Sequence, residues 1–116
     1  MAAIAQTTSG SNATATVTET ELTGTDTLTY TGAGQILVIR NATGVQQTVN
    51  LLGDGVTETA KPCEGGGTID LTTGFDVVVA AGAVESVRLS SIRDYINIGT
   101  VDVTGGVASV YAYIIV

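Results

Sequence analysis

The sequence predicts an all-β fold, either a compact β-sandwich or a small β-barrel. Threonine is abundant, 15 residues are glycine and one is proline, and this composition favours pleated strands joined by glycine turns over helices. Residues 13–20 alternate small apolar and polar side chains, which is the period of two of a half-buried strand. Short apolar runs separated by glycine-containing breaks continue along the rest of the chain, as in sandwiches and barrels.

Each run is short enough to be a single strand. We expect strands at residues 13–20, 27–31, 35–40, 45–51, 68–71, 76–80, 84–90, 100–104 and 108–116. The breaks between them contain glycine, which adopts positive φ without steric cost and therefore suits tight turns. Residues 90–96 depart from this pattern, because Ile92, Tyr95 and Ile96 fall at helical spacing after a serine. A single helical turn and a bent strand are both compatible with that segment.

The chain of 116 residues has room for one domain with one core. Residues 1–12 are polar or small and show no periodicity, so they cannot offset the entropy of their own ordering. We expect a flexible N-terminal arm over residues 1–12 and a single β domain over residues 13–116. Ala2, Ala3 and Ile4 would serve as the anchor that orders this arm against a neighbouring protein.

Charge and hydropathy exclude two classes of partner. Eleven acidic residues against four basic ones give a net charge of -7, which repels polyanions such as nucleic acid. No stretch approaches the roughly 18 apolar residues that a membrane span requires, and the first residues have neither the basic nor the apolar part of a signal peptide. The single cysteine, Cys63, cannot form an internal disulfide, so synthesis in a reducing cytoplasm is expected.

The residues of common catalytic and metal sites are missing or isolated. Histidine is absent, which removes the commonest general base and metal ligand. Cys63 has an acidic neighbour and no imidazole to generate a thiolate. Asp54 lacks the alternating carboxylates of a calcium loop, and Gly65–Gly67 are not followed by the lysine of a phosphate loop. We therefore expect no enzymatic activity, no cofactor and no metal.

The last strand is the most informative segment. Ala108, Val110, Ala112, Ile114 and Val116 fall on one face, and Tyr111, Tyr113 and Ile115 fall on the other. A strand buried on one side only would have polar residues opposite its core face. Either this strand is central to the core, or its outer face is covered by a partner. In the second case Tyr111, Tyr113 and Ile115 belong to a self-association or capsid-contact surface.

Several segments give the chain a resemblance to a known class. The Ala/Thr/Gly-rich arm, residues 65–74 (GGGTIDLTTG), residues 84–90 (VESVRLS) and residues 101–106 (VDVTGG) are similar in style to small bacteriophage head proteins. The chain most resembles capsid decoration, or cement, proteins in size, composition and pattern. No residue motif is carried over from that class.

The resemblance implies a compact β domain that binds the major capsid protein on the outside of an assembled phage capsid and stabilises it. It also implies a virion location after synthesis in the host cytoplasm, and a homo-oligomer, with a trimer favoured over a monomer or dimer. The alternative is a tail, receptor-binding or carbohydrate-binding β module of a phage particle.

Overall fold

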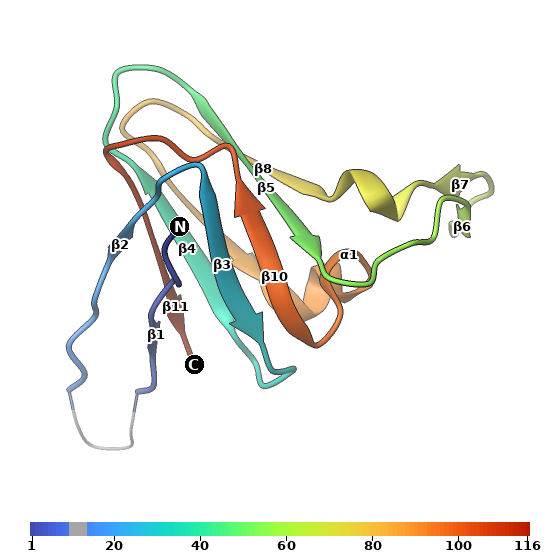
Figure 1. Ribbon diagram of the computed structural model, residues 1–116, viewed down its shortest axis with the longest axis horizontal. Coiled ribbons are helices and arrows are strands. Elements are labelled where there is room, and N and C mark those ends of the chain that lie inside the picture. The colour runs from blue at the N-terminus through green and yellow to red at the C-terminus, as the bar shows by residue number, and fades with distance from the viewer. Residues whose placement is uncertain (10–13) are drawn as a thin grey trace.

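Figure 1 shows the computed structural model, which describes residues 1–9 and 14–116. The described strands are β1 (Gln6–Thr7), β2 (Thr20–Glu21), β3 (Thr25–Tyr30), β4 (Ile36–Asn41), β5 (Gln47–Gly53), β6 (Lys61–Pro62), β7 (Thr68–Ile69), β8 (Phe75–Val79), β9 (Val84–Arg88), β10 (Gly99–Thr104) and β11 (Val110–Ile115). The helical segments are η1 (Leu71–Thr73), η2 (Leu89–Ile92) and α1 (Arg93–Ile96). This strand-rich architecture, with one short α-helix among the described residues, agrees with the expected all-β class.

The longer strands form two sheets. One sheet has the order β3-β10-β5-β8, and its neighbouring strands are antiparallel. The other has the order β1-β11-β4-β9, with β2 also paired to β11. In that sheet β11, β4 and β9 are antiparallel, whereas β1 runs parallel to β11. The short strands β6 and β7 pair with each other and project away from both sheets (Figure 1).

One hydrophobic core contains side chains from both sheets. Alternate residues of the longer strands β3, β4, β5, β10 and β11 are buried, among them Leu37 and Ile39 of β4, Leu51 of β5, Val103 of β10 and Ile114 of β11. All five side chains are at most 1 % exposed. Burying each such side chain contributes about 1.5–3 kcal/mol. The core is mainly aliphatic, with Tyr30 as its one buried aromatic side chain among the described residues and with Phe75 and Tyr95 packed against it.

The segment after β9 is helical, which decides between the two alternatives for residues 90–96. The η2 turn and α1 bury Leu89, Ile92 and Ile96 in the core. The backbone of α1 lies directly on Gly53 of β5, where an added Cβ would overlap the carbonyl group of Ile96 and lie 2.6 Å from its Cα. A residue without a side chain is therefore needed at position 53.

The first nine residues lie against the domain, which differs from the expectation of a free arm. Ile4 is 7 % exposed and belongs to the core. Its backbone nitrogen donates to the Thr27 carbonyl at 2.8 Å, while Gln6 and Thr7 pair with Ile114 and Ile115. A single apolar residue and a free strand edge thus suffice to hold this segment. The rest of the expected arm, residues 10–12, falls outside the described residues.

The expected strand over residues 13–20 is also corrected. Residues 14–19 form no strand, and pairing begins only at Thr20. The side chains of residues 14–19 are all exposed, because an alternation of Ala and Thr presents too little apolar area to hold a strand on the core. Position 13 lies outside the described part of the chain.

Candidate functional site: the outer face of the five-stranded sheet

Apolar side chains gather on the outer face of the sheet that contains β4, β9 and β11. Residues paired directly across neighbouring strands point to the same face. The register places Tyr113 and Ile115 of β11 beside Val38 and Ile36 of β4, and Tyr111 beside Arg40. Arg40 in turn lies beside Val84 of β9. We call this surface the outer apolar face. Its members are Ile36, Val38, Val84, Tyr111, Tyr113 and Ile115.

The last strand combines both of the alternatives that its sequence allows. Val110, Ala112 and Ile114 are fully or almost fully buried in the core. Tyr111 and Tyr113 lie on the outer apolar face and are half-buried, with Arg40 over the Tyr111 ring and Val17 and Glu19 beside Tyr113. The strand is therefore central to its sheet, and its second side still offers apolar area to a partner.

A charged pair borders this face next to Tyr111. The Arg40 guanidinium donates to both carboxylate oxygens of Glu19, at 2.9 and 3.2 Å. It also lies 4.4 Å from the centre of the Tyr111 ring, a cation–π contact. The hydrogen bond to Glu19 raises the pKa of Arg40 above its ordinary value, so this side chain remains a cation. The pair therefore covers one side of the Tyr111 ring.

A shallow hollow opens beside Tyr113. It is lined by Val17, Glu19, Arg40, Val84 and Tyr113 and has a volume of about 290 Å³. Val17 and Val84 are 42 % and 55 % exposed. The segment before β2 thus forms one wall of the hollow, and an apolar side chain from another molecule could enter between its two valines.

The outer face of the other sheet is polar. The registers place Thr25, Thr27 and Thr29 of β3 beside Thr100, Asp102 and Thr104 of β10. The neighbouring positions on β5 and β8 include Thr48, Asn50 and Asp76. Val78, which is 50 % exposed, lies opposite Thr48 on this side. The two outer surfaces of the molecule therefore differ in composition. The first combines tyrosine, isoleucine and valine with Arg40, Ser86 and Arg88, whereas the second is mainly threonine, asparagine and aspartate with Leu52 and Val78.

The N-terminal residues expected to contact a neighbour are engaged within their own chain. Ala2 donates its backbone N–H to Asp26 Oδ1 at 3.0 Å, Ala3 forms a parallel bridge with Thr27, and Ile4 is buried. They do not lie among the residues of the outer apolar face. In this conformation Ile4 is unavailable to a partner, Ala2 is half-buried with its backbone N–H and carbonyl hydrogen-bonded, and Ala3 is exposed.

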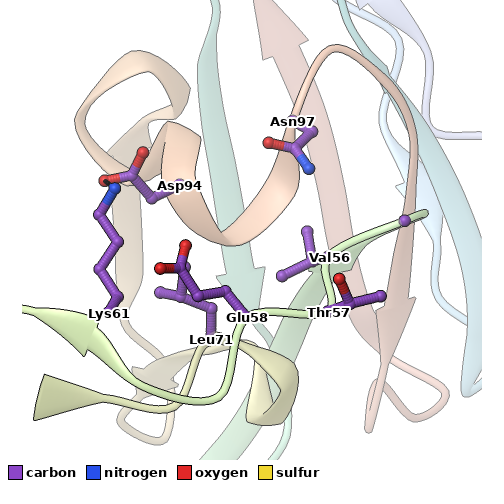
Figure 2. A pocket seen from close by; sticks show the side chains of 8 residues that line it. Val56, Thr57, Glu58, Lys61, Leu71, Asp94 and Asn97 are labelled. Atoms are coloured by element: carbon purple, nitrogen blue, oxygen red, sulfur yellow. Dashed lines mark ion pairs between the residues drawn. The ribbon is translucent and has the colours of Figure 1, made fainter.

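A second hollow lies beside α1, as Figure 2 shows. Its volume is about 310 Å³, and its polar side chains include Thr57, Glu58, Lys61, Asp94 and Asn97. Lys61 Nζ is 3.7 Å from Asp94 Oδ2, and both side chains are substantially exposed. Asn97 ends α1 with φ 51°. This cluster offers donors and acceptors to a small polar ligand but has no exposed aromatic platform among its lining residues.

The other candidate metal-binding and nucleophilic side chains do not gather into a site within the described residues. Within residues 1–9 and 14–116, no three His, Cys, Asp or Glu side chains gather as metal ligands, and no helix is long and apolar enough to cross a membrane. Cys63 is half-buried in the β6–β7 hairpin, where its sulfur lies 3.8 Å from the Lys61 carbonyl oxygen.

Three of the six members of the outer apolar face, Ile36, Val38 and Val84, were not predicted from the sequence. Ile36 and Val38 alternate with the buried Leu37 and Ile39, so residues 36–39 are apolar on both faces, the same signal that singled out the last strand. Val84 gave no such signal and joins the face only through the sheet register.

Comparisons with protein-family models, with curated proteins and with solved structures gave no match for this chain.

Proposed function

We propose that this chain is a structural virion protein that binds the outer surface of an assembled phage capsid and stabilises it, without enzymatic activity. The resemblance to decoration proteins suggests this role and the major capsid protein as partner. In this proposal the two sheets form a β-sandwich, the protein is made in the host cytoplasm, and it attaches through the outer apolar face as a homo-oligomer, with a trimer favoured.

One observation carries the proposal, namely the contrast between the two outer surfaces. Water solvates the hydroxyl groups of threonine and the carboxylate groups of aspartate well. The outer face formed by β3 and β10 is therefore suited to face water. On the opposite side Tyr111, Tyr113 and Ile115 adjoin Ile36 and Val38. Tyrosine is favoured in protein interfaces because its ring buries a large area while its hydroxyl reaches a polar rim.

The charges around the outer apolar face also favour a protein partner. Arg40 and Arg88, two of the four basic residues of the chain, point to this side. Glu19 and Glu21 lie at its edge, one bonded to Arg40 and one paired with Tyr111 in the register. The face is therefore close to neutral on a molecule of net charge -7, so a second acidic copy is not repelled there.

The test compares two valines of equal size on opposite surfaces. Val84 is 55 % exposed on the outer apolar face, and Val78 is 50 % exposed on the threonine-rich face. Val84→Ser should weaken self-association and co-sedimentation with purified capsids, and Tyr113→Ser should weaken them further. Val78→Ser should leave both unchanged, because its surface faces solvent in the assembly.

Sedimentation velocity at several protein concentrations measures self-association, and capsid pelleting measures attachment. We expect wild-type chains to sediment at about three times the 11.7 kDa chain mass and to appear in the capsid pellet. A wild type that stays monomeric at high concentration and is absent from the pellet would overturn the proposal. Equal loss of assembly in Val84→Ser and Val78→Ser would show that the outer apolar face is not the contact surface.

The hollow beside α1 favours the second candidate, a receptor- or carbohydrate-binding module of a phage tail. Its convergent Glu58, Lys61 and Asp94 side chains (Figure 2) could hydrogen-bond sugar hydroxyls. Binding on a glycan array that disappears in Asp94→Ala and persists in Val84→Ser would support this candidate over capsid attachment.

A further inference from the structure

One edge of the sheet that contains the outer apolar face is open. β9 is the last strand in the order β1-β11-β4-β9, and among the described strands it pairs with β4 alone. The far side of β11 is occupied by β1 and β2, and β3, at the end of the other sheet, is bridged by Ala3. By contrast, four of the five residues of β9 are exposed. Its backbone edge therefore faces solvent.

The hydrogen-bond pattern shows which backbone groups of β9 are free. The Asn41 nitrogen donates to the Ala83 carbonyl at 3.0 Å, just beyond one end of the β4–β9 register. The Leu89 nitrogen donates to the Gln35 carbonyl at 3.0 Å, just beyond the other end. Consecutive residues of an antiparallel strand turn their N–H and C=O groups to opposite sides, and the register between these two bonds is unbroken. Odd-numbered residues of β9 thus bond to β4, and the even-numbered ones point away from it. The even-numbered residues are Val84, Ser86 and Arg88.

These outward groups form a regular row. The Arg88 carbonyl accepts from Ser91 Oγ at 2.7 Å, and the other outward groups have no hydrogen-bond partner within residues 1–9 and 14–116. They repeat at every second residue, which is a spacing of about 6.8 Å along the strand. Donors and acceptors that alternate at this spacing match the backbone of another extended chain, as in strand addition. The chemistry of this edge therefore specifies an extended polypeptide as its occupant.

The charges on β9 disfavour pairing with the same edge of a second copy. Two β9 edges can face each other and run antiparallel only about a two-fold axis perpendicular to the sheet. An axis at Val84, Glu85 or Ser86 places the two Glu85 side chains opposite or diagonal to each other. An axis at Val87 or Arg88 does the same to the two Arg88 side chains. Because like charges at such positions are destabilising, each of these registers is unfavourable.

The same two charges suit a strand from a different protein. Both side chains are exposed, and neither ion pair in the part of the chain that the structure describes involves Glu85 or Arg88. Opposite-charge pairs across neighbouring strands are stabilising. In an antiparallel partner, the residue opposite Arg88 comes three positions before the residue opposite Glu85. A partner with an acidic residue followed three positions later by a basic one therefore pairs with both.

We propose that the β9 edge is a docking site for an extended segment of another protein that carries this acidic–basic pattern. The partner strand continues the sheet beyond β9 and bonds to the outward groups of Val84, Ser86 and Arg88. Apolar partner residues opposite Val84 and Val87 add contact area on the two faces. The inference does not depend on the role proposed for the outer apolar face, because it rests on the backbone edge and not on that face.

The first experiment measures binding of two blocked fluorescent peptides to the full chain by fluorescence anisotropy. The peptide TEVTKVT places glutamate opposite Arg88 and lysine opposite Glu85, and TKVTEVT exchanges the two charges. TEVTKVT should bind about tenfold more tightly, as two cross-strand charge pairs change from favourable to unfavourable. In the double variant Glu85→Arg, Arg88→Glu the preference should reverse. Equal binding of both peptides, or an unchanged preference in the double variant, refutes the proposed pairing.

The second experiment tests the backbone edge itself. Ser86→Pro removes an outward N–H and leaves the β4 ladder intact, since proline is tolerated on an edge strand whose N–H faces solvent. It should weaken TEVTKVT binding about tenfold, whereas the matched control Ser86→Ala should bind as the wild type does. Circular dichroism checks that the proline variant is folded, and the charge-exchanged double variant tests the proposal if it is not. Absence of binding at millimolar peptide would mean that the charges only guard the edge against aggregation. Loss of self-association in Ser86→Pro would assign the edge to a second copy, and either result refutes the proposal.

Discussion

Replacing Gly53 by alanine tests how closely α1 packs on β5. The added Cβ would overlap the Ile96 carbonyl oxygen and carbon and lie 2.6 Å from the Ile96 Cα. All three atoms belong to the backbone, so no side-chain rotation relieves the overlap. Either α1 moves away from the sheet by more than an ångström, or β5 bends at its last residue.

The cost follows from what α1 buries. Overpacking a core by one methyl group costs about 1–3 kcal/mol, and full exposure of Ile96, which is 0 % exposed, would cost about 1.5–3 kcal/mol. We expect Gly53→Ala to lower the free energy of unfolding by about 3 kcal/mol. For a domain of this size that corresponds to a decrease of roughly 10 °C in the melting temperature.

Urea denaturation followed by circular dichroism measures the effect. Gly44→Ala is the matched control, because Gly44 has nothing within 4 Å of an added Cβ and no positive φ. The control should unfold within about 0.5 kcal/mol of wild type, as surface substitutions usually do. If the two variants unfold at the same urea concentration, the contact between α1 and Gly53 does not have the geometry described.

Three further predictions concern polar groups. Asn41→Ala should cost about 3 kcal/mol in urea unfolding, because the fully buried Asn41 amide donates to the Val45 and Val79 carbonyls and accepts from the Thr43 N–H, and these hydrogen bonds would be lost. Burial raises the pKa of Asp26, but the hydrogen bonds from Thr23, Ala2 and Gly24 outweigh burial and lower the pKa. The stabilisation by Asp26 is therefore present above about pH 3.9 and is lost as the pH falls through its folded value. Asp26→Asn should therefore flatten the acid limb of a melting-temperature profile. Glu19→Gln should leave the melting temperature nearly unchanged, since the Arg40–Glu19 pair is exposed.

The sequence predicted strands best where several large apolar residues follow one another. Residues 35–40 and 108–116 contain such runs and form β4 and β11. Residues 14–19 alternate only Ala15 and Val17 with threonine and form no strand. The period of two is thus informative when one face carries enough area to bury, and the Ala/Thr pattern carries too little.

Pairing between distant segments explains the remaining differences. Ile4 alone gave no periodicity, and its burial depends on the free edges of β3 and β11, which local sequence does not reveal. Likewise, Tyr111 and Tyr113 were predicted as a row, but their neighbours Ile36, Val38 and Val84 follow from strand register. Strand register depends on the whole sheet. The sequence of one strand therefore predicts only its own part of a surface that three strands form.

The parallel pairing of β1 with β11 has a consequence for protein synthesis. Ser9 bonds to Val116, 107 positions further along the chain, and β11 lies in the middle of its sheet between β1 and β4. While the ribosome is still translating the domain, β4 lacks one neighbour and Ile4 has no complete pocket. Residues 1–9 are therefore made long before their partner strand and are among the last of the domain to settle, and until β11 emerges the nascent chain exposes an open strand edge on which chaperones could act.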